Sequence, residues 1–207
     1  MIKILLSTYN GESYIREQLE SYTYQTYKDF EVLVRDDGST DKTVEIIKNF
    51  RALYNIKLVC GENKGVNGSF FELLSIAGES QYYAFSDQDD YWLPEKLNRA
   101  VSTIKSFESN RNMPFLYCSS FIKADRNLIP IKHVKRNIEP SFSNSLLQSI
   151  ASGLTIVINN SARELLLSHL PDMKKICMYD WWFALVISAF GVVYYDQYPA
   201  VTSSKSW

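Results

Sequence analysis

The first part of the chain alternates short apolar runs with segments in which apolar residues recur at helical spacing. The runs predict strands, because a short apolar stretch closed by polar turn formers is typical of a parallel strand covered on both faces. The predicted strands cover residues 2–6, 30–34 and 56–59, and the predicted helices cover residues 13–24 and 42–53. Ser13 and Asp41 are candidate N-caps of these two helices. The alternation predicts right-handed crossover units and an α/β fold with a mostly parallel central sheet flanked by helices.

The second part of the chain continues the alternation less regularly. Helices are predicted at residues 69–77 and 94–107, strands at 82–85 and 115–122, and alternating helix and strand segments at 146–152, 154–158, 162–170, 181–189 and 192–195. Residues 123–144 carry five Lys or Arg and two Pro without a clear period, which predicts a mobile loop across the mouth of an active site. We expect residues 1–207 to form one domain.

The composition narrows the function classes. A chain of 207 residues with 46% hydrophobic residues is suited to one globular core. A formal net charge of -1 argues against nucleic-acid binding through a general basic surface. The three cysteines, Cys60, Cys118 and Cys177, are widely spaced and odd in number, which argues against a disulfide framework and a four-thiolate zinc site. A cytoplasmic protein is therefore expected.

The distribution of apolar residues predicts no membrane-spanning helix. The apolar run at residues 2–6 is too short for a signal peptide. The longest apolar stretch, residues 181–195, is interrupted by Ser188 and Gly191 and falls short of the roughly 20 residues that a spanning helix needs. Peripheral association with the inner face of the cell membrane stays compatible with this pattern.

Polar segments follow three of the predicted strands. They occupy residues 7–10, 36–37 and 86–90. In open α/β sheets, ligands bind beyond the carboxyl ends of the strands, so we expect these three segments to meet in one crevice.

Asp87 and Asp89 have the spacing of a shared cation site. Two positions apart on an extended segment, both side chains lie on the same side and can bind one hard cation, with Mg²⁺ or Mn²⁺ as the fitting ions. Such an ion stabilises the charge that develops on a departing phosphate. The alternative is an acidic turn that caps the helix beginning near Pro94. The position after a buried strand favours the cation site.

Asp36 and Asp37 also have two interpretations. A turn carboxylate can cap the following helix, but Asp41 is better placed for that, which leaves Asp36 and Asp37 without a structural role. Adjacent carboxylates repel each other, whereas a carboxylate that accepts the imide N–H of a uracil or thymine ring gives a specific contact. We favour the binding of a base.

Several segments, taken together, carry a resemblance to a known family. They are residues 7–11 (STYNG), 25–27 (QTY), 34–41 (VRDDGSTD) and 86–97 (SDQDDYWLPEKL). In these segments the chain resembles family 2 inverting glycosyltransferases with the GT-A (Rossmann-like) fold. Residues 62–70 (ENKGVNGSF) and 180–182 (DWW) resemble its bacterial rhamnosyltransferase-like branch, which builds cell-surface polysaccharide. The resemblance runs to about residue 195 and is sparse in the 123–144 loop.

The resemblance implies a role for each matching residue. Residues 1–95 would bind a nucleotide-diphospho-sugar donor, and residues 96–207 would bind a glycan or lipid-linked acceptor. The implied donor-binding residues are Ser7, Tyr9, Asp36, Asp37, Asp87 and Gln88, and the implied metal ligands are Asp89 and Asp87. Asp180 matches the general base that removes the acceptor proton during a single, inverting displacement. Either a uridine or a deoxythymidine diphospho-sugar satisfies the same carboxylate contact.

Other interpretations of the second half stay open. Asp180, before an aromatic helix, is by itself typical of an N-terminal cap. Trp181 and Trp182 suit either core packing or an acceptor-binding platform for a sugar face. Gly153 suits either an ordinary turn or a close approach of the backbone to the acceptor.

The C-terminal residues depart from the family. Many members carry an Arg and His motif after the last strand, and residues 198–207 lack it. Either Lys205 and the basic 123–144 loop contact the diphosphate, or the chain is a non-catalytic nucleotide-sugar-binding scaffold. A sugar-phosphate nucleotidyltransferase is disfavoured because residues 7–11 lack a Gly-rich basic phosphate loop. A glycosidase would leave the base-binding carboxylates unexplained.

Overall fold

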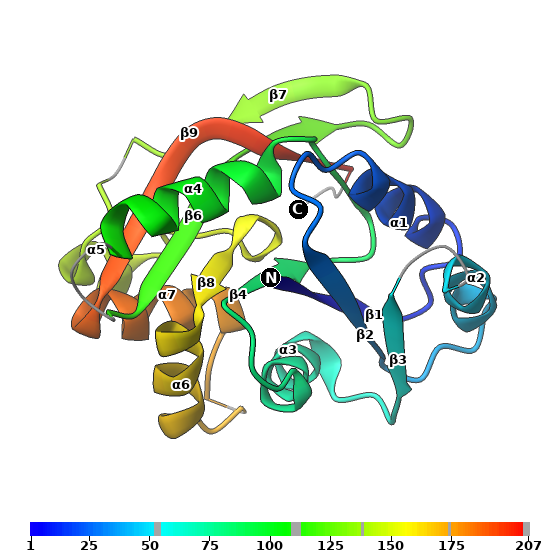
Figure 1. Cartoon of the computed structure of the whole chain (residues 1–207), viewed down its shortest axis with the longest axis horizontal. Helices are drawn as coiled ribbons and strands as arrows, with labels where there is room; N and C mark the ends of the chain where they lie inside the picture. The colour runs from blue at the N-terminus through cyan, green and yellow to red at the C-terminus, as the bar shows by residue number, and fades with distance from the viewer. Residues whose placement is uncertain (52–54, 109–112, 138, 174, 205–207) are drawn as a thin grey trace.

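The described part of the chain forms a twisted nine-stranded sheet, and helices cover both faces of the sheet (Figure 1). The computed structural model describes residues 1–51, 55–108, 113–137, 139–173 and 175–204. The strands are β1 Ile2–Thr8, β2 Phe30–Asp36, β3 Ile56–Cys60, β4 Tyr82–Ser86, β5 Asp90–Trp92, β6 Phe115–Ala124, β7 Pro130–Val134, β8 Val157–Asn159 and β9 Val192–Ser203. The helices are α1 Ile15–Thr23, α2 Thr43–Phe50, α3 Gly65–Ile76, α4 Lys96–Glu108, α5 Phe142–Leu147, α6 Asn160–Ser168 and α7 Tyr179–Phe190, with a 3₁₀ turn, η1, at Gly153–Thr155.

The order of the strands brings the polar segments to one edge of the sheet. The order is β3-β2-β1-β4-β8-β6-β9-β5, and β7 pairs with β6. β1 lies between β2 and β4 and is parallel to both, with Thr8 opposite Asp36 and Leu6 opposite Ser86. The carboxyl ends of the three strands therefore lie side by side, as the sequence predicts.

Two apolar cores fill the space between the sheet and its helices. Successive side chains of a strand point to opposite faces, so Ile4 and Leu6 join one core and Leu5 joins the other. Helices α1, α2 and α4 cover the first face, and α3, α6 and α7 cover the second (Figure 1). Burial on both faces explains why β1 and β4 read as continuous apolar runs rather than as alternating ones.

The predicted α/β fold with a mostly parallel sheet flanked by helices is confirmed, with its antiparallel additions in the second half. β8 is antiparallel to β4 and β6, and β5 is antiparallel to β9. β5 was not predicted from the sequence. The last strand was predicted to end at residue 195, whereas β9 extends to Ser203. Pairing with β5 and with the far half of β6 supports this extension, and such long-range contacts leave no local pattern.

The segment at residues 123–144 is more ordered than the predicted loop. β6 turns back into β7, and the two strands pair antiparallel from Phe121 opposite Val134 to Ala124 opposite Pro130. Residues 130–133 of β7 are exposed whether they are polar or apolar, so burial leaves no alternating pattern in this part of the sequence. Two smaller predictions also differ: the N-cap of α1 is Tyr14 rather than Ser13, and Leu53, the predicted end of the second helix, lies outside the described residues.

In the part of the chain that the structure describes, none of the helices combines the length and the apolar character that crossing a membrane requires.

Candidate functional site

The loop after β1 is tied to the acidic loop after β4. The side chain of Gln88 accepts a hydrogen bond from the Tyr9 N–H at 2.8 Å and donates one to the Tyr9 carbonyl at 2.9 Å. A Cβ at Gly11 would overlap the Gln88 amide, so the glycine is required for this approach. Gln88 therefore fixes the relative position of the two loops, and the Tyr9 side chain is left 47% exposed at their rim.

Three carboxylates converge where β4 turns into β5. Asp87, Asp89 and Asp90 each offer an oxygen, and these oxygens lie within 4.8 Å of one another. Asp90 belongs to β5 and is held opposite Ser203 of β9, so the second half of the sheet fixes one side of the cluster. An all-oxygen set of this kind suits Mg²⁺ or Mn²⁺. The structure thus brings the predicted metal pair together and adds Asp90.

Lys96 lies beneath this cluster and was not singled out by the sequence analysis. The side chain is fully buried, and its ammonium donates to the Leu154 carbonyl at 2.7 Å and lies 4.3 Å from the centre of the Trp92 ring. Burial lowers the pKa of Lys96 to about 7, although the charges of Asp90 and Asp87 act in the opposite direction. The sequence feature that could have indicated burial of Lys96 is its position four residues before Ala100, on the same face of α4.

Asp36 and Asp37 have structural partners, so the inference that they lack a structural role was wrong. Asp36 is 1% exposed and accepts hydrogen bonds from Thr8 and from the N–H and hydroxyl of Ser39. Asp37 forms an ion pair with Arg35 and accepts from the backbone N–H groups of Lys64 and Gly65, which begin α3. A carboxylate accepts about four hydrogen bonds. Three of these are used in each case, so about one acceptor position remains on each carboxylate, and both residues are buried.

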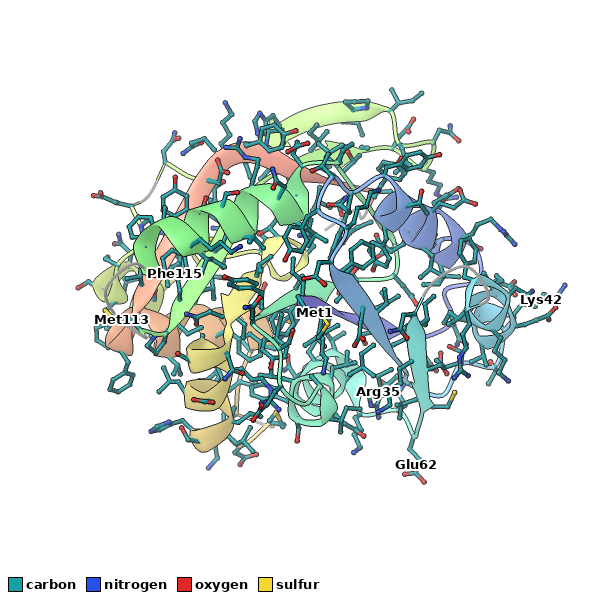
Figure 2. The ribbon with its side chains drawn as sticks, in the orientation of Figure 1. Met1, Arg35, Lys42, Glu62, Met113 and Phe115 are labelled. Carbon is teal, nitrogen blue, oxygen red and sulfur yellow. The ribbon has the colours of Figure 1, made fainter. Side chains whose placement is uncertain are left out.

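Arg35 and Ser69 form further contacts with the residues at the carboxyl ends of β1 and β2. The guanidinium of Arg35 also donates to Glu72 and to the Glu62 carbonyl, both at 2.9 Å. Figure 2 shows Arg35 near the ends of β2 and β3, with Glu62 just beyond β3. The Ser7 and Ser69 hydroxyls share a hydrogen bond of 2.6 Å, so Ser7 faces α3 at the end of β1. The predicted nucleoside-binding residues thus form a connected wall around the carboxyl ends of β1 and β2.

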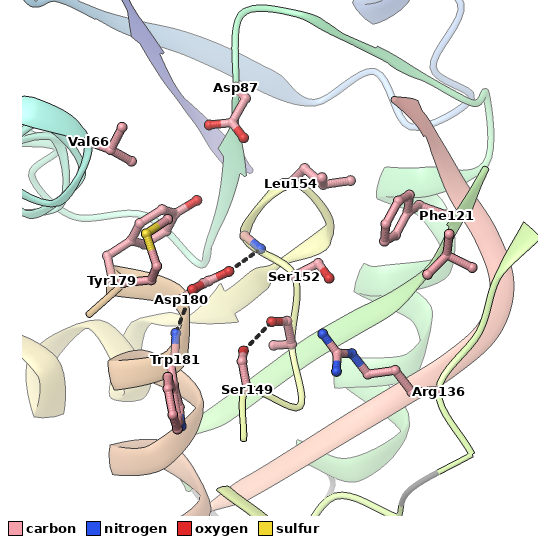
Figure 3. A pocket seen from close by; sticks show the side chains of 14 residues that line it. Val66, Asp87, Phe121, Arg136, Ser149, Ser152, Leu154, Tyr179, Asp180 and Trp181 are labelled. Atoms are coloured by element: carbon pink, nitrogen blue, oxygen red, sulfur yellow. Dashed lines mark hydrogen bonds between the residues drawn. The ribbon is translucent and has the colours of Figure 1, made fainter. Parts of the chain in front are cut away.

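A cavity of about 410 Å³ opens beside the acidic loop (Figure 3). Its walls come from the end of β4, the start of α3, the β6–β7 hairpin, the segment before η1 and the start of α7. The lining residues are Val66, Asp87, Phe121, Val134, Arg136, Ser149, Ala151, Ser152, Gly153, Leu154, Met178, Tyr179, Asp180 and Trp181. Asp87 and Asp180 therefore share one cavity, whereas Ser7, Tyr9, Asp36 and Asp37 are not among its lining residues.

Asp180 is oriented by two backbone donors. Its Oδ2 accepts from the Gly153 N–H at 2.9 Å and its Oδ1 accepts from the Trp181 N–H at 2.7 Å. It is the second residue of α7, after the N-cap Met178, so it lies in the first turn without being the cap itself. Burial raises the pKa of Asp180, and the charge of Asp87 adds to this effect, while the two N–H groups and Arg136 lower it. Asp180 is therefore a partly buried carboxyl with a raised pKa, a property that general bases share.

Tyr179 lies near both Asp87 and Asp180. The residue is 2% exposed, and its hydroxyl finds no hydrogen-bond partner among the described residues. Burial raises its pKa, and the charges of Asp87, Asp180 and Asp90 add to the effect. Figure 3 shows Tyr179 on the cavity wall beside Asp180, below Asp87. A Cβ at Gly153 would overlap this hydroxyl, so close packing against Tyr179 explains the glycine.

The two tryptophans have different surroundings. Trp181 lines the cavity next to Asp180, and its indole N–H donates to the Ser145 carbonyl at 2.6 Å. Trp182 packs against the core under α7 and does not line that cavity, although both tryptophans line a neighbouring groove of about 250 Å³. The geometry thus supports a sugar platform at Trp181, and it gives Trp182 mainly a packing role.

Arg136 is a charged cavity residue that was not predicted individually from the sequence. It belongs to the predicted basic loop, where its neighbours Lys132 and Lys135 are exposed while Arg136 lines the cavity. The only sequence feature that pointed to Arg136 was the run of basic residues around it. Lys205, the other candidate for a phosphate contact, lies outside the described residues.

Comparison with known proteins finds matches over most of the chain. The family model described as "Glycosyl transferase family 2" matches residues 3–143. The dTDP-rhamnosyl transferase RfbG of Shigella flexneri is 27% identical over 190 residues, which cover 85% of this chain and 62% of that protein.

Solved structures share the fold. TarS 1–349 of S. aureus in complex with UDP-GlcNAc superposes with a TM-score of 0.77 at 23% identity, over 100% of this chain and 59% of that one. The mannosyltransferase PcManGT of Pyrobaculum calidifontis, in complex with GDP-Man and Mn²⁺, gives a TM-score of 0.69 at 20% identity, over 98% of this chain and 56% of that one. These are GT-A structures, so the predicted GT-A fold is confirmed. The chain spans about three fifths of the length of these proteins.

Proposed function

The chain belongs to glycosyl transferase family 2, as the match over residues 3–143 establishes, and from this premise we propose that it is an inverting glycosyltransferase of bacterial cell-surface polysaccharide synthesis. The proposed reaction moves a sugar from a nucleotide-diphospho-sugar to an acceptor hydroxyl. The observation that carries the proposal is that Asp87 of the acidic loop and the partly buried Asp180 line one cavity, although they come from opposite halves of the chain.

The acidic loop is proposed to hold the diphosphate end of the donor. Asp89 and Asp87 supply the carboxylates for a divalent ion, Mn²⁺ or Mg²⁺, and Asp90 supports them from β5. Such an ion, when bound, neutralises the charge that develops on the departing diphosphate. Gln88 holds this loop against the loop after β1 through its two hydrogen bonds with the Tyr9 backbone.

The nucleoside is proposed to bind along the ends of β1 and β2. Ser7 and Tyr9 line this part, and Asp36 or Asp37 accepts a hydrogen bond from the base. The single acceptor position left on each carboxylate supports one such contact and sets its direction, since the other positions are taken by Thr8, Ser39, Arg35 and the start of α3.

Asp180 is proposed to be the general base. The acceptor oxygen attacks the anomeric carbon and transfers its proton to Asp180, while the bond from that carbon to the phosphate oxygen breaks and its electron pair stays on the diphosphate. Attack on the face opposite the leaving group inverts the anomeric configuration. The Gly153 and Trp181 N–H groups hold the carboxylate in place, and Trp181 supports the acceptor sugar beside it.

Two substitutions test the proposal. Asp89→Asn is expected to abolish the part of nucleotide-sugar binding that depends on Mn²⁺, and Asp180→Asn is expected to abolish transfer while donor affinity stays within about twofold. Glu95→Gln is the matched control for the first variant, because it removes a nearby carboxylate outside the cluster. Equal donor affinity in wild type and Asp89→Asn, measured by thermal shift with and without Mn²⁺, would refute the metal assignment.

The same measurements separate an enzyme from a binding protein. Slow hydrolysis of the donor in the presence of Mn²⁺ supports the enzyme, because water replaces the acceptor. Tight donor binding without hydrolysis or transfer across an acceptor panel supports a non-catalytic scaffold instead. A screen of uridine and deoxythymidine diphospho-sugars in the same assay identifies the base.

A further inference from the structure

Arg136 places a positive charge inside a cavity whose other charged groups are acidic. Its side chain is half-buried and lines the cavity that Asp87 and Asp180 share (Figure 3). Among the residues that the structure describes, its guanidinium takes part in no ion pair or hydrogen bond. A guanidinium held partly away from water without a carboxylate partner is costly, so a ligand that supplies the partner is favoured.

The backbone of Arg136 is fixed to the sheet. Its N–H donates to the Tyr195 hydroxyl at 2.9 Å, and its carbonyl accepts from the Gln197 amide at 3.3 Å. Both partners belong to β9, a strand bound to β6 along most of its length. The guanidinium is thus presented to the cavity from a supported position.

Arg136 lies on the acceptor side of the proposed reaction. In Figure 3, Asp87 lies at the top and Arg136 at the lower right of the cavity, and Asp180 lies on the left wall at intermediate height. If the diphosphate binds at Asp87 and Asp89, the anomeric carbon lies between this loop and Asp180, and the attacking hydroxyl approaches from the side of Asp180. A group that extends from the acceptor away from the donor then meets Arg136.

We propose that Arg136 binds an anionic group, a phosphate or a carboxylate, carried by the acceptor close to the attacked hydroxyl. This assignment rests on the proposed sugar transfer and names the chemical class of its acceptor. Arginine forms paired hydrogen bonds with both oxyanions. It also offsets the repulsion that Asp180 and Asp87 exert on an anionic acceptor, and the hydroxyl of Ser152 on the same wall offers a neutral hydrogen bond.

The experiment compares acceptors in matched pairs. Wild type, Arg136→Gln and Lys135→Gln are assayed with neutral p-nitrophenyl hexosides, hexose 1-phosphates and hexuronic acids. Lys135→Gln is the control because it removes an exposed charge from the adjacent position. We expect wild type and Lys135→Gln to prefer one anionic class, and Arg136→Gln to lose about 10- to 100-fold of kcat/KM on that class alone. The phosphate and carboxylate arms identify which oxyanion is bound.

Two further readouts keep the outcomes separate. Donor affinity of Arg136→Gln, and its donor hydrolysis at a pH well above the acidic limb, are expected to match wild type. Absence of donor hydrolysis by wild type itself would refute the proposed function rather than the anion site. A fall in donor affinity in Arg136→Gln would overturn the assignment, because it would show that Arg136 contacts the donor diphosphate.

An acceptor-independent measurement covers the case in which the panel contains no substrate. Methyl phosphate and acetate are titrated by calorimetry into the chain saturated with nucleoside diphosphate and Mg²⁺. Binding of either anion to wild type that is lost in Arg136→Gln and kept in Lys135→Gln supports the site. Absence of binding in wild type, or equal binding in all three chains, overturns it.

Discussion

Asp180 and Gly153 are 27 positions apart in sequence, yet the Oδ2 of Asp180 accepts a hydrogen bond of 2.9 Å from the Gly153 N–H. This contact joins the start of α7 to the η1 turn. The next residue of that turn, Leu154, accepts a hydrogen bond from buried Lys96, which lies under the acidic loop. The orientation of the proposed base and the position of the proposed metal ligands therefore depend on the same short turn.

Gly153→Ala is expected to reduce turnover without affecting donor binding. The added Cβ would overlap the Tyr179 hydroxyl, so either η1 or the start of α7 has to shift, and Asp180 shifts with it. A displacement of about 1 Å at a reacting group costs roughly 10²-fold in rate. Measured kcat is expected to fall by at least about tenfold, with donor affinity within about twofold.

Ser152→Ala provides the control for the η1 turn. It changes the neighbouring side chain of the same cavity wall without adding an atom. If both variants lower kcat equally, the effect belongs to the wall in general and not to the packing of Gly153 against Tyr179.

The acidic limb of the pH profile is expected to report on Asp180. A general base acts in its deprotonated form, so kcat/KM falls when the pH drops through the pKa of the base. Burial raises the pKa of Asp180 above its ordinary value of 3.8, and the limb is therefore expected above that value. Arg136 lowers this pKa, so Arg136→Gln is expected to move the limb to higher pH.

Donor hydrolysis measured between about pH 4 and pH 8 at saturating metal checks this prediction. Lys135→Gln is expected to leave the limb in place, because Lys135 is exposed outside the cavity. A limb in Arg136→Gln that coincides with that of wild type would mean that the titrating group is not Asp180.

Tyr179→Phe is expected to weaken donor binding while leaving the fold intact. The Tyr179 hydroxyl is buried without a partner among the described residues. Tyr179 lines the same cavity as Asp87, where the donor diphosphate is proposed to bind (Figure 3). Removing an unpaired buried hydroxyl leaves the free energy of unfolding unchanged or raises it by up to about 1 kcal/mol. Donor affinity is expected to fall roughly 5- to 10-fold if the hydroxyl donates to the donor.

Tyr83→Phe is the matched control, because the Tyr83 hydroxyl is bonded to Ser80, Gly78 and Asn160 away from the site. This variant is expected to lose about 1–2 kcal/mol of stability and keep its donor affinity. Thermal unfolding of both variants with and without nucleotide-sugar distinguishes the two patterns. Unchanged affinity in Tyr179→Phe would remove Tyr179 from the donor site.

The part of the fold that depends on local pattern was predictable. β1, β2 and β4 are short apolar runs buried on both faces, and the polar segments after them mark the edge where the site lies. The position of Asp87 at this edge followed from that rule. Asp180 required the family resemblance, because an acid at the start of an aromatic helix looks like a cap.

The parts that the sequence did not predict depend on contacts between distant residues. β5 exists because Asp90 pairs opposite Ser203, and no local period marks such a pairing. The partners of Asp36 and Asp37 lie across the sheet at Thr8 and at the start of α3, so their structural roles were invisible in the turn itself. Arg136 lines the cavity because β7 folds back on β6, which a run of basic residues does not predict.

Asp196→Asn is expected to destabilise the fold in a pH-dependent way. Asp196 is buried on β9 and accepts two hydrogen bonds from Arg99 of α4 and one from the Tyr117 hydroxyl of β6. Burial raises its pKa, but Arg99, the Tyr198 N–H and Tyr117 together lower it below the ordinary 3.8. Loss of the charged hydrogen bonds is expected to cost about 2 kcal/mol near neutral pH, or roughly 4–8 °C in Tm.

The direction of the pH dependence follows from the lowered pKa. A carboxylate whose pKa is lower in the folded chain stabilises it above the unfolded value, and this contribution disappears as the pH falls through the folded value. The difference in free energy of unfolding between wild type and Asp196→Asn is therefore expected to be full above about pH 5 and to shrink at lower pH. Asp172→Asn, which removes a surface pair with Lys175, is expected to change stability by less than about 0.5 kcal/mol. A difference that stays constant from pH 7 down to about pH 3 would show that Asp196 contributes through packing rather than through its charge.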